Sequence, residues 1–183
     1  MLIICGKTAS GKDTIVRRLV SDYKFKRIIT YTSRPMRNGE IQNKSYHFIT
    51  ENDFKDKINN NFFAEWKIYH TVSGNWYYGT ALKDLENADE NSVIILTPDG
   101  IRDILELLDK KPKCIYINSP DEVIEERLLL RGDDEREAKR RLQHDSEDFM
   151  NIEKLVDQEF LNLNNTNIRD ICENIVMWLS LNK

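Results

Sequence analysis

The stretch GKTASGKDT, residues 6–14, decides the fold of this chain. It follows the apolar run Leu2 to Cys5, which a glycine ends as it would end a buried parallel strand. From Asp13 onward, apolar residues recur at helical spacing and predict an amphipathic helix. A strand, a glycine-rich loop and a helix in this order predict an α/β protein with an anion-binding loop after its first strand.

Three residues of the stretch, Gly6, Gly11 and Lys12, match the pattern G-x-x-x-x-G-K. The glycines let consecutive backbone N–H groups point at phosphate oxygens, and the start of the helix adds positive potential. Lys12 supplies a mobile charge that can follow a migrating phosphoryl group. The residues that we expect to bind the phosphates of ATP are Gly6, Ser10, Gly11, Lys12, Asp13 and Thr14.

Asp13 departs from this pattern, because a Ser or Thr that coordinates magnesium usually follows the lysine. A carboxylate there brings negative charge near a triphosphate. It also suits the start of a helix, by roughly 0.3–1 kcal/mol at exposed sites, and it can contact Mg²⁺ directly or through water. The hydroxyl of Thr14 is one residue further on. We therefore expect a working loop with Mg²⁺ as cofactor and Asp13 as a candidate Mg²⁺ ligand.

Length and composition are those of one ordinary domain. The 183 residues are 40% hydrophobic and 32% charged, and the net charge of −4 gives no strong footprint for nucleic acid. The three cysteines, Cys5, Cys114 and Cys172, cannot all pair with one another and lack metal-ligand spacing. No segment approaches the roughly 18 apolar residues of a membrane span. We expect a cytoplasmic protein with reduced core thiols that binds neither nucleic acid nor membrane.

Apolar runs alternate with helical patterns along the chain, which favours a parallel sheet covered by helices on both faces. Further strands are expected at Ile28–Thr32, Ser92–Leu96, Lys113–Ile117 and Phe160–Leu163. Further helices are expected near Glu51–Asn60, around Ile101–Leu108, from Ser119 to about Leu130, from there to about Asp157 after a break at Arg131–Asp134, and at Ile168–Leu181. The polar, aromatic segment Ser33–Thr80 is interpreted as an inserted subdomain.

The insert carries the candidate acceptor site. Arg34 and Arg37 stand three residues apart beside tyrosines, and such a pair can clamp a phosphate monoester. Glu65 precedes Trp66. Taken singly, each of these charged residues could also be an ordinary surface charge.

The order of these segments resembles the guanylate kinase family, whose pattern reads roughly T-T-R-x-P-R-x-G-E, then Y-x-F, then E-W, then Y-Y-G-[ST]. The matching segments are Tyr31–Glu40, Ser45–Phe48, Phe63–Trp66 and Tyr77–Thr80. The resemblance covers nearly the whole chain. It implies a P-loop NTPase fold, a three-layer αβα arrangement with a parallel sheet. The single domain would comprise a core (1–32, 81–126 and 158–183), an insert that binds a nucleoside monophosphate (33–80) and a helical lid (127–157).

The resemblance also implies roles for residues. Those that would hold the phosphate of GMP are Arg34, Arg37, Tyr46 and Tyr78, and those that would contact the guanine are Thr30, Glu65 and Thr80. The carboxylate of Glu65 can accept both N1–H and N2–H of guanine, whereas adenine offers an unprotonated N1 and no amine at C2. The catalytic residues would be Lys12 and the lid arginines Arg131 and Arg141, with Arg127 a weaker candidate. We expect Arg136, Lys139 and Arg140 to lie on a solvated helix face.

Two further departures from the family pattern concern the acceptor base. Acidic residues usual at the end of the third core strand are replaced by Ile95-Leu96-Thr97-Pro98, with Asp99 displaced. The segment from Glu65 to Tyr78 is about four residues longer than usual, so the rim of the base pocket is expected to differ.

The function that this resemblance implies is ATP-dependent phosphorylation of GMP or dGMP to GDP or dGDP by in-line transfer. Two alternatives stay open: a kinase for another nucleoside monophosphate, and a non-catalytic guanylate-kinase-like binding module. Such modules typically lose the loop lysine and the lid arginines, whereas this chain keeps Lys12, Arg131 and Arg141. The expected partners are ATP and the monophosphate, and both a monomer and a homodimer are compatible with the sequence.

Overall fold

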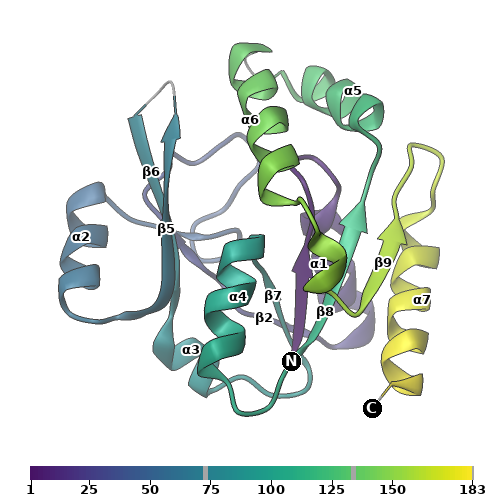
Figure 1. Cartoon of the computed structure of the whole chain (residues 1–183), viewed down its shortest axis with the longest axis horizontal. Coiled ribbons are helices and arrows are strands. Elements are labelled where there is room, and N and C mark those ends of the chain that lie inside the picture. The colour runs from purple at the N-terminus through teal and green to yellow at the C-terminus, as the bar shows by residue number, and fades with distance from the viewer. Residues whose placement is uncertain (72–73, 133–134, 183) are drawn as a thin grey trace.

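A five-stranded parallel sheet forms the centre of the computed structural model, which describes residues 1–71, 74–132 and 135–182 (Figure 1). Its strand order is β2-β7-β1-β8-β9. The strands are β2 (Lys26–Arg27), β7 (Ser92–Ile95), β1 (Leu2–Cys5), β8 (Lys113–Asn118) and β9 (Gln158–Leu161). The helices around this sheet are α1 (Lys12–Tyr23), α3 (Leu82–Glu86), α4 (Pro98–Leu107) and α7 (Ile168–Leu181). The predicted α/β fold class is confirmed.

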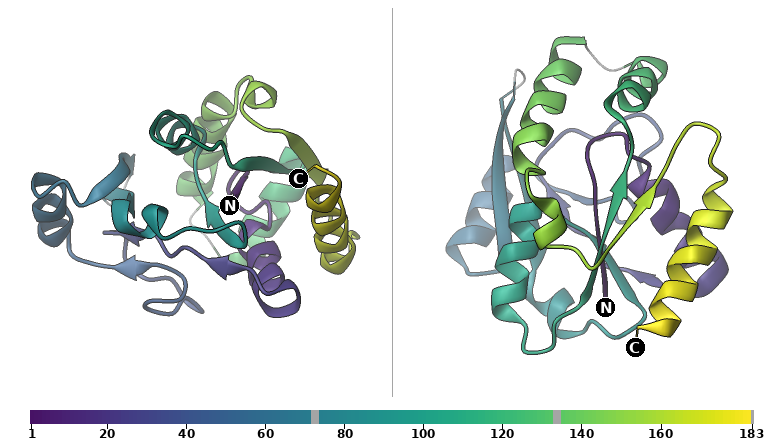
Figure 2. Two further views of the ribbon diagram at one scale, coloured as in Figure 1. Left: turned by 90° about the horizontal axis from the view of Figure 1, so that it is seen from below. Right: turned by 45° about the vertical axis from the view of Figure 1, so that its right-hand side comes forward.

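The sheet is apolar on both faces, as a covered parallel sheet must be. Alternate residues of β1 point to opposite sides, so that Leu2 and Ile4 pack with α1 and α7, whereas Ile3 and Cys5 pack with α4. Figure 2 shows the sheet between α4 on one side and α1 with α7 on the other. The parallel strands therefore present their carboxyl ends, and the loops that follow them, at one edge of the molecule.

The insert forms a second sheet of order β4-β3-β6-β5. Its strands are β4 (His47–Phe48), β3 (Tyr31–Thr32), β6 (Gly74–Ala81) and β5 (Phe63–Thr71), and α2 (Glu51–Asn59) packs against it. The expected single strand Ile28–Thr32 is wrong. The chain leaves the core sheet at Arg27 and joins the second sheet at Tyr31, so one apolar run serves two sheets.

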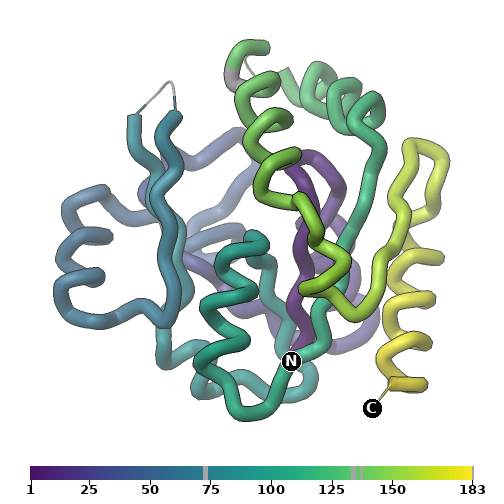
Figure 3. The backbone as a smooth tube through the Cα atoms, viewed as in Figure 1, coloured from purple at the N-terminus to yellow at the C-terminus, as the bar shows by residue number. Residues whose placement is uncertain are grey.

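Two helices stand over the edge formed by the carboxyl ends of the core strands (Figure 3). They are α5 (Asp121–Arg131) and α6 (Glu135–Asp148), and the short 3₁₀ helix η1 (Ile152–Lys154) follows them. The expectation of a helix to about Asp157 is wrong, because α6 ends at Asp148. Asn151 then adopts the left-handed conformation with φ of 61°, which asparagine tolerates better than most residues.

All three cysteines are buried and free. Cys5 and Cys114 lie in the layer between the sheet and α4, whereas Cys172 lies in the layer that α1 and α7 cover. Within residues 1–71, 74–132 and 135–182, none of the helices has the length and apolar character that crossing a membrane requires.

Candidate active site

The loop between β1 and α1 has space for glycine alone at two positions. A Cβ on Gly6 would lie 2.5 Å from the carbonyl oxygen of Ile117. Gly11 has φ of +93°, and a Cβ there would collide with the side-chain amide of Asn162. The loop is thus packed against β8 from below and against Asn162 from the side, which leaves its inner surface open for a ligand.

Lys12 folds back over this loop. Its Nζ donates to the carbonyl oxygens of Gly6 and Lys7 at 2.6 Å each, and it lines a cavity above the loop. Burial lowers the pKa of Lys12, the positive charge of Arg131 acts in the same direction, and the carboxylates of Asp13 and Asp145 oppose the shift. The ammonium group is therefore held by neutral carbonyls that an anionic ligand can replace.

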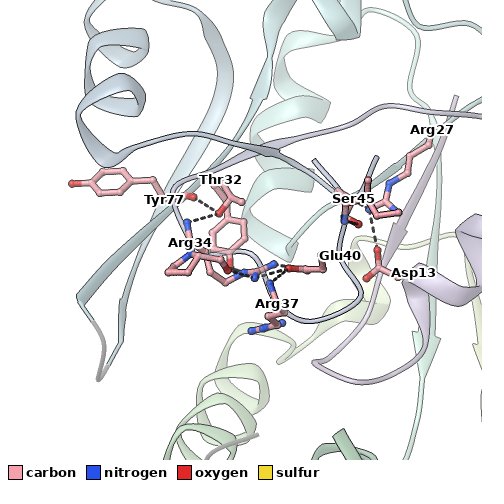
Figure 4. A network of polar contacts seen from close by, with 11 residues as sticks. Asp13, Arg27, Thr32, Arg34, Arg37, Glu40, Ser45 and Tyr77 are labelled. Carbon is pink, nitrogen blue, oxygen red and sulfur yellow. Dashed lines mark hydrogen bonds and ion pairs between the residues drawn. The ribbon is translucent and has the colours of Figure 1, made fainter. Parts of the chain in front are cut away.

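Asp13 is exposed and paired. Its carboxylate lies 2.9 Å from the guanidinium of Arg27 in β2, which also donates to the backbone oxygen of Ser45 (Figure 4). Thr14 is exposed on the first turn of α1. Across the described part of the chain, no cluster of three or more His, Cys, Asp or Glu side chains is arranged to hold a metal ion. The carboxylate of Asp13 is thus balanced by the guanidinium of Arg27.

A cavity of about 230 Å³ lies above the loop and is shared by the core, the insert and the lid. The expected site residues that line it are Gly6, Lys12, Thr30, Arg37, Glu65, Tyr78 and Arg141. It therefore brings together residues that are up to 135 positions apart in the sequence, from Gly6 to Arg141. Other expected residues, such as Thr80, Arg34 and Tyr46, contact residues that line the cavity.

One face of the β5–β6 hairpin forms a wall of this cavity. Alternate residues of a strand share a face, and the antiparallel register pairs Glu65 with Thr80, Lys67 with Tyr78 and Tyr69 with Trp76. The hairpin residues that line the cavity are Glu65, Lys67, Tyr69, Thr71, Trp76 and Tyr78. This face runs from a carboxylate at its lower end to aromatic rings at its upper end.

Glu65 is buried at the lower end of the wall, with 8% of its surface exposed. The hydroxyl of Thr80 donates to its Oε1 at 2.5 Å. A Cβ on Gly100 of α4 would lie 3.2 Å from Oε2, so a glycine there leaves room for the carboxylate. Burial raises the pKa of Glu65 to about 6, against the opposing effect of the Thr80 hydrogen bond. A buried carboxylate oriented by the Thr80 hydroxyl is suited to accept N–H groups from a ligand.

Arg34 is buried, and its guanidinium forms several hydrogen bonds with other residues of the insert. Its guanidinium donates to both carboxylate oxygens of Glu40 at 2.6 and 2.9 Å (Figure 4). Its Nε donates to the hydroxyl of Tyr78 at 3.1 Å. The guanidinium carbon lies 5.4 Å from the centre of the Tyr46 ring. Burial opposes the charge of Arg34, yet Glu40 raises its pKa above the usual value.

Arg37 is oriented differently. Its backbone N–H donates to Glu40 at 2.7 Å, while its guanidinium points away from that pair (Figure 4) and lines the cavity. Burial lowers the pKa of Arg37, and the positive charges of Arg34, Arg141 and Arg131 lower it further. The positive charges of both lid arginines therefore reach Arg37, which favours binding of an anion beside it.

Arg127 contacts the outside of the phosphate loop and is not among the residues that line the cavity. Its guanidinium donates to the backbone oxygen of Ala9 and to the hydroxyl of Ser119 at 3.2 Å each, and to the backbone oxygen of Asn162. The side-chain amide of Asn162 in turn donates to the backbone oxygen of Ser10 at 2.7 Å. These residues support the phosphate loop from its outer side, a role that no motif in the sequence predicts.

Several residues that line the cavity were not expected there. Lys67 forms an ion pair with Asp99 at 2.8 Å, and Asp145 of α6 accepts a hydrogen bond from the backbone N–H of Thr8 in the loop. Arg140 also lines the cavity, although we expected it on a solvated face, whereas Lys139 is exposed as expected. The period-2 alternation of the hairpin was the signal that could have identified Lys67.

Comparison with known proteins places these features in a family. The family model described as guanylate kinase matches residues 1–180. A guanylate kinase from Nitratidesulfovibrio vulgaris is 37% identical over 148 residues, which are 78% of this chain and 69% of that protein. One from Wolinella succinogenes is 34% identical over 143 residues, 75% of this chain and 65% of that protein. A crystal structure of guanylate kinase from Anaplasma phagocytophilum has a TM-score of 0.72 at 23% identity and covers 100% of this chain and 85% of that chain, a likeness of fold.

Proposed function

The chain belongs to the guanylate kinase family, and from this premise we propose that it transfers the γ-phosphoryl group of ATP to GMP or dGMP. One observation carries the proposal. Lys12, Arg37 and Arg141 line the same cavity as the buried carboxylate of Glu65. A cavity with a cluster of cations at one end and a buried acceptor of N–H groups at the other fits a nucleotide that has phosphate and guanine groups.

The donor side of the proposal consists of the loop and the lid. The residues that would bind ATP phosphates are Gly6, Ser10, Gly11, Lys12, Asp13 and Thr14. Lys12 would exchange the carbonyls of Gly6 and Lys7 for phosphate oxygens and follow the transferring group. Arg131 and Arg141 would stabilise the charge that spreads over three phosphoryl oxygens, since such transfer depends on positioning and electrostatics.

The acceptor side consists of the insert. Arg37 and Tyr78 would contact the phosphate of GMP directly. Arg34, packed on the ring of Tyr46, would help to position Arg37 through Glu40, which binds both the Arg34 guanidinium and the backbone N–H of Arg37. Glu65 would accept N1–H and N2–H of guanine. Thr30 would donate to O6, and Thr80, whose hydroxyl bonds to Glu65, would orient that carboxylate. Holding both nucleotides in line converts a two-molecule reaction into a positioned one.

Mg²⁺ is implied by the family as the companion of ATP. The residues present fit a Mg²⁺ ion bound mostly by phosphate oxygens and water, which needs one or two protein carboxylates rather than a protein cage. Asp13, which is paired with Arg27, would supply the protein ligand together with Thr14 beside it. When bound, Mg²⁺ neutralises part of the phosphate charge during transfer.

A kinase for another nucleoside monophosphate is the second candidate. It is favoured by Thr97, which lines the cavity where the family pattern has an acid, and by the ion pair of Lys67 with Asp99 beside it.

We also propose the division into core, insert and lid at the boundaries expected from the sequence. Tyr31 and Thr32, which fall within the expected core segment, form strand β3 of the insert sheet. A cytoplasmic location belongs to the same proposal, and both a monomer and a homodimer are compatible with it.

The test is an assay of ADP release with Mg²⁺–ATP and a panel of GMP, dGMP, AMP, UMP and dTMP. We expect GMP and dGMP to give the highest kcat/KM. A preference for another monophosphate would overturn the guanine assignment and leave a nucleoside monophosphate kinase. Absence of turnover with all five would overturn the proposed function.

A further inference from the structure

We propose that Trp76 is a positioning residue that holds the guanidinium of Arg141 over the cavity, so that the insert hairpin sets the place of a lid arginine. The guanidinium carbon of Arg141 lies 5.4 Å from the centre of the Trp76 ring. This is within the roughly 6 Å at which the face of a tryptophan attracts a cation. The inference rests on the proposed function, because the proposed function makes Arg141 a catalytic residue.

The upper end of the hairpin is built to face the lid. Tyr69 and Trp76 are opposite each other in the β5–β6 register, so their side chains lie on the same face, and both line the cavity. Trp76 contacts Arg141, and the Tyr69 ring lies 5.6 Å from the ring of His144. In Figure 3 the β5–β6 hairpin and α6 both extend into the upper part of the molecule.

The lid helix presents one face to these contacts. Arg141, His144 and Asp145 are at positions i, i+3 and i+4 of α6, which share a face of a helix. Arg141 and His144 contact the hairpin, whereas Asp145 accepts the N–H of Thr8 in the phosphate loop. The helix is thus held between the insert and the loop. These three contacts all come from the same face of α6.

Arg141 needs such a contact for an electrostatic reason. Its positive charge is among the causes that lower the pKa of Arg37, so the two guanidinium groups repel each other across the cavity. An attractive contact on the cavity wall opposes this repulsion, which would otherwise favour turning the long side chain of Arg141 away from Arg37. The ring of Trp76 offers an attractive surface that carries no charge of its own and does not compete with phosphate for the guanidinium edge.

The kinetic test compares three substitutions. Trp76→Leu keeps an apolar side chain but removes the π face, and Trp76→Phe keeps a smaller π face. Trp66→Leu is the matched control, because Trp66 lies on the opposite face of the same hairpin and is 39% exposed. We expect kcat to fall about tenfold in Trp76→Leu and at most about threefold in Trp76→Phe. Trp66→Leu should stay within about twofold of wild type.

A double-mutant cycle separates positioning from direct contact with substrate. In an Arg141→Ala background, Trp76→Leu should change kcat by less than about twofold, because Trp76 acts through the group already removed. Hydrogen exchange supplies a readout besides activity, since amides of residues 135–148 should exchange faster in Trp76→Leu than in Trp66→Leu without nucleotide.

An effect of Trp76→Leu that persists in full without Arg141, or unchanged exchange in α6, would overturn the role of Trp76. If the wild type is active and Trp76→Leu has the same kcat, the role of Trp76 is overturned and the proposed function is not. A wild type inactive with all five monophosphates would overturn the proposed function and this role with it.

Discussion

Glu40 binds the guanidinium of Arg34 through both of its carboxylate oxygens, at 2.6 and 2.9 Å, and also accepts the backbone N–H of Arg37 at 2.7 Å. Arg34 and Arg37 therefore have different surroundings although they are three residues apart. Arg34 is 3% exposed and its charge is balanced inside the insert, whereas Arg37 lines the cavity among other cations. The pair behaves as one structural arginine and one arginine for a ligand.

Substituting the two arginines by alanine should separate these roles. Arg34→Ala leaves Glu40 half-buried without its cation and should lower the free energy of unfolding by about 3–5 kcal/mol. Arg37→Ala relieves repulsion and should leave it unchanged within about 1 kcal/mol, but should raise KM for GMP at least about tenfold, since it removes a charge-assisted bond. Urea unfolding and steady-state kinetics measure both. Equal losses of stability would contradict the distinction.

Lys12→Ala should lower kcat at least about a hundredfold in a folded protein, because the reaction depends on electrostatic stabilisation of the phosphoryl group. Lys7→Ala is the matched control: the same loop loses the same charge, but Nζ of Lys7 is bound to Asp121 at 2.7 Å. We expect less than about fivefold for Lys7. Near-normal turnover in folded Lys12→Ala would refute the role of Lys12.

Asp13→Ser should keep or raise activity with Mg²⁺–ATP. The side chain of Asp13 is 57% exposed, so losing its ion pair with Arg27 should cost at most about 1 kcal/mol of stability. A serine hydroxyl would restore the usual ligand type of such loops. Titration of activity with Mg²⁺ compares the variants, with Asp13→Ala as the control that lacks any oxygen ligand. A wild type that binds no ATP, with binding restored in Asp13→Ser, would show that the departure disables the loop.

Glu65→Gln should weaken the use of GMP by about 1.5–3 kcal/mol in kcat/KM, the range for a hydrogen bond to a charged group. The amide keeps the shape of the side chain but offers one acceptor in place of two. KM for ATP should change little, because the donor residues lie on the loop and the lid. An unchanged kcat/KM for GMP in Glu65→Gln would contradict the guanine-binding role.

Because burial raises the pKa of Glu65 to about 6, a rise in pH should lower the stability of the fold and improve the binding of GMP. The folded state binds the proton more tightly than the unfolded state does, so stability falls as pH rises from about 4.5 to 6, by about 2 kcal/mol. Over the same range the carboxylate ionises, so KM for GMP should fall as pH rises. Thermal unfolding of wild type against Glu65→Gln at pH 4.5 and 7 measures the first effect. The variant should be relatively more stable at pH 7, and a difference that does not change with pH would disprove the shift.

Local patterns predicted much of the core. Leu2–Cys5 is a strand and Ile168–Leu181 a helix with the expected bounds, because each carries its period in its own residues. The run Ile28–Thr32 failed for the opposite reason. It is uniformly suited to a strand, and nothing local indicates that Arg27 pairs with β7 while Tyr31 pairs with β6. The change of sheet is decided by tertiary contacts.

The site also contains residues that local sequence predicts and contacts that it does not. Lys12 and Glu65 could be predicted from motifs, and both line the cavity. The contact of Asp145 with Thr8 and that of Arg141 with Trp76 join residues far apart in the sequence. Only the packing of α6 between the loop and the hairpin creates them, so the charged pattern of α6 alone was compatible with a solvated face.

Burial of the three cysteines makes them natural reporters of transient opening. Burial raises the pKa of Cys5 and Cys114 to about 12 and that of Cys172 to about 11, so reactive thiolate is scarce at neutral pH. An alkylating reagent can therefore modify each thiol only while its surroundings are open. Cys172 samples the layer under α1 and α7, and Cys5 and Cys114 sample the layer under α4. The alkylation rates of the wild-type chain thus measure, with no label introduced, how often each side of the sheet separates from its helices.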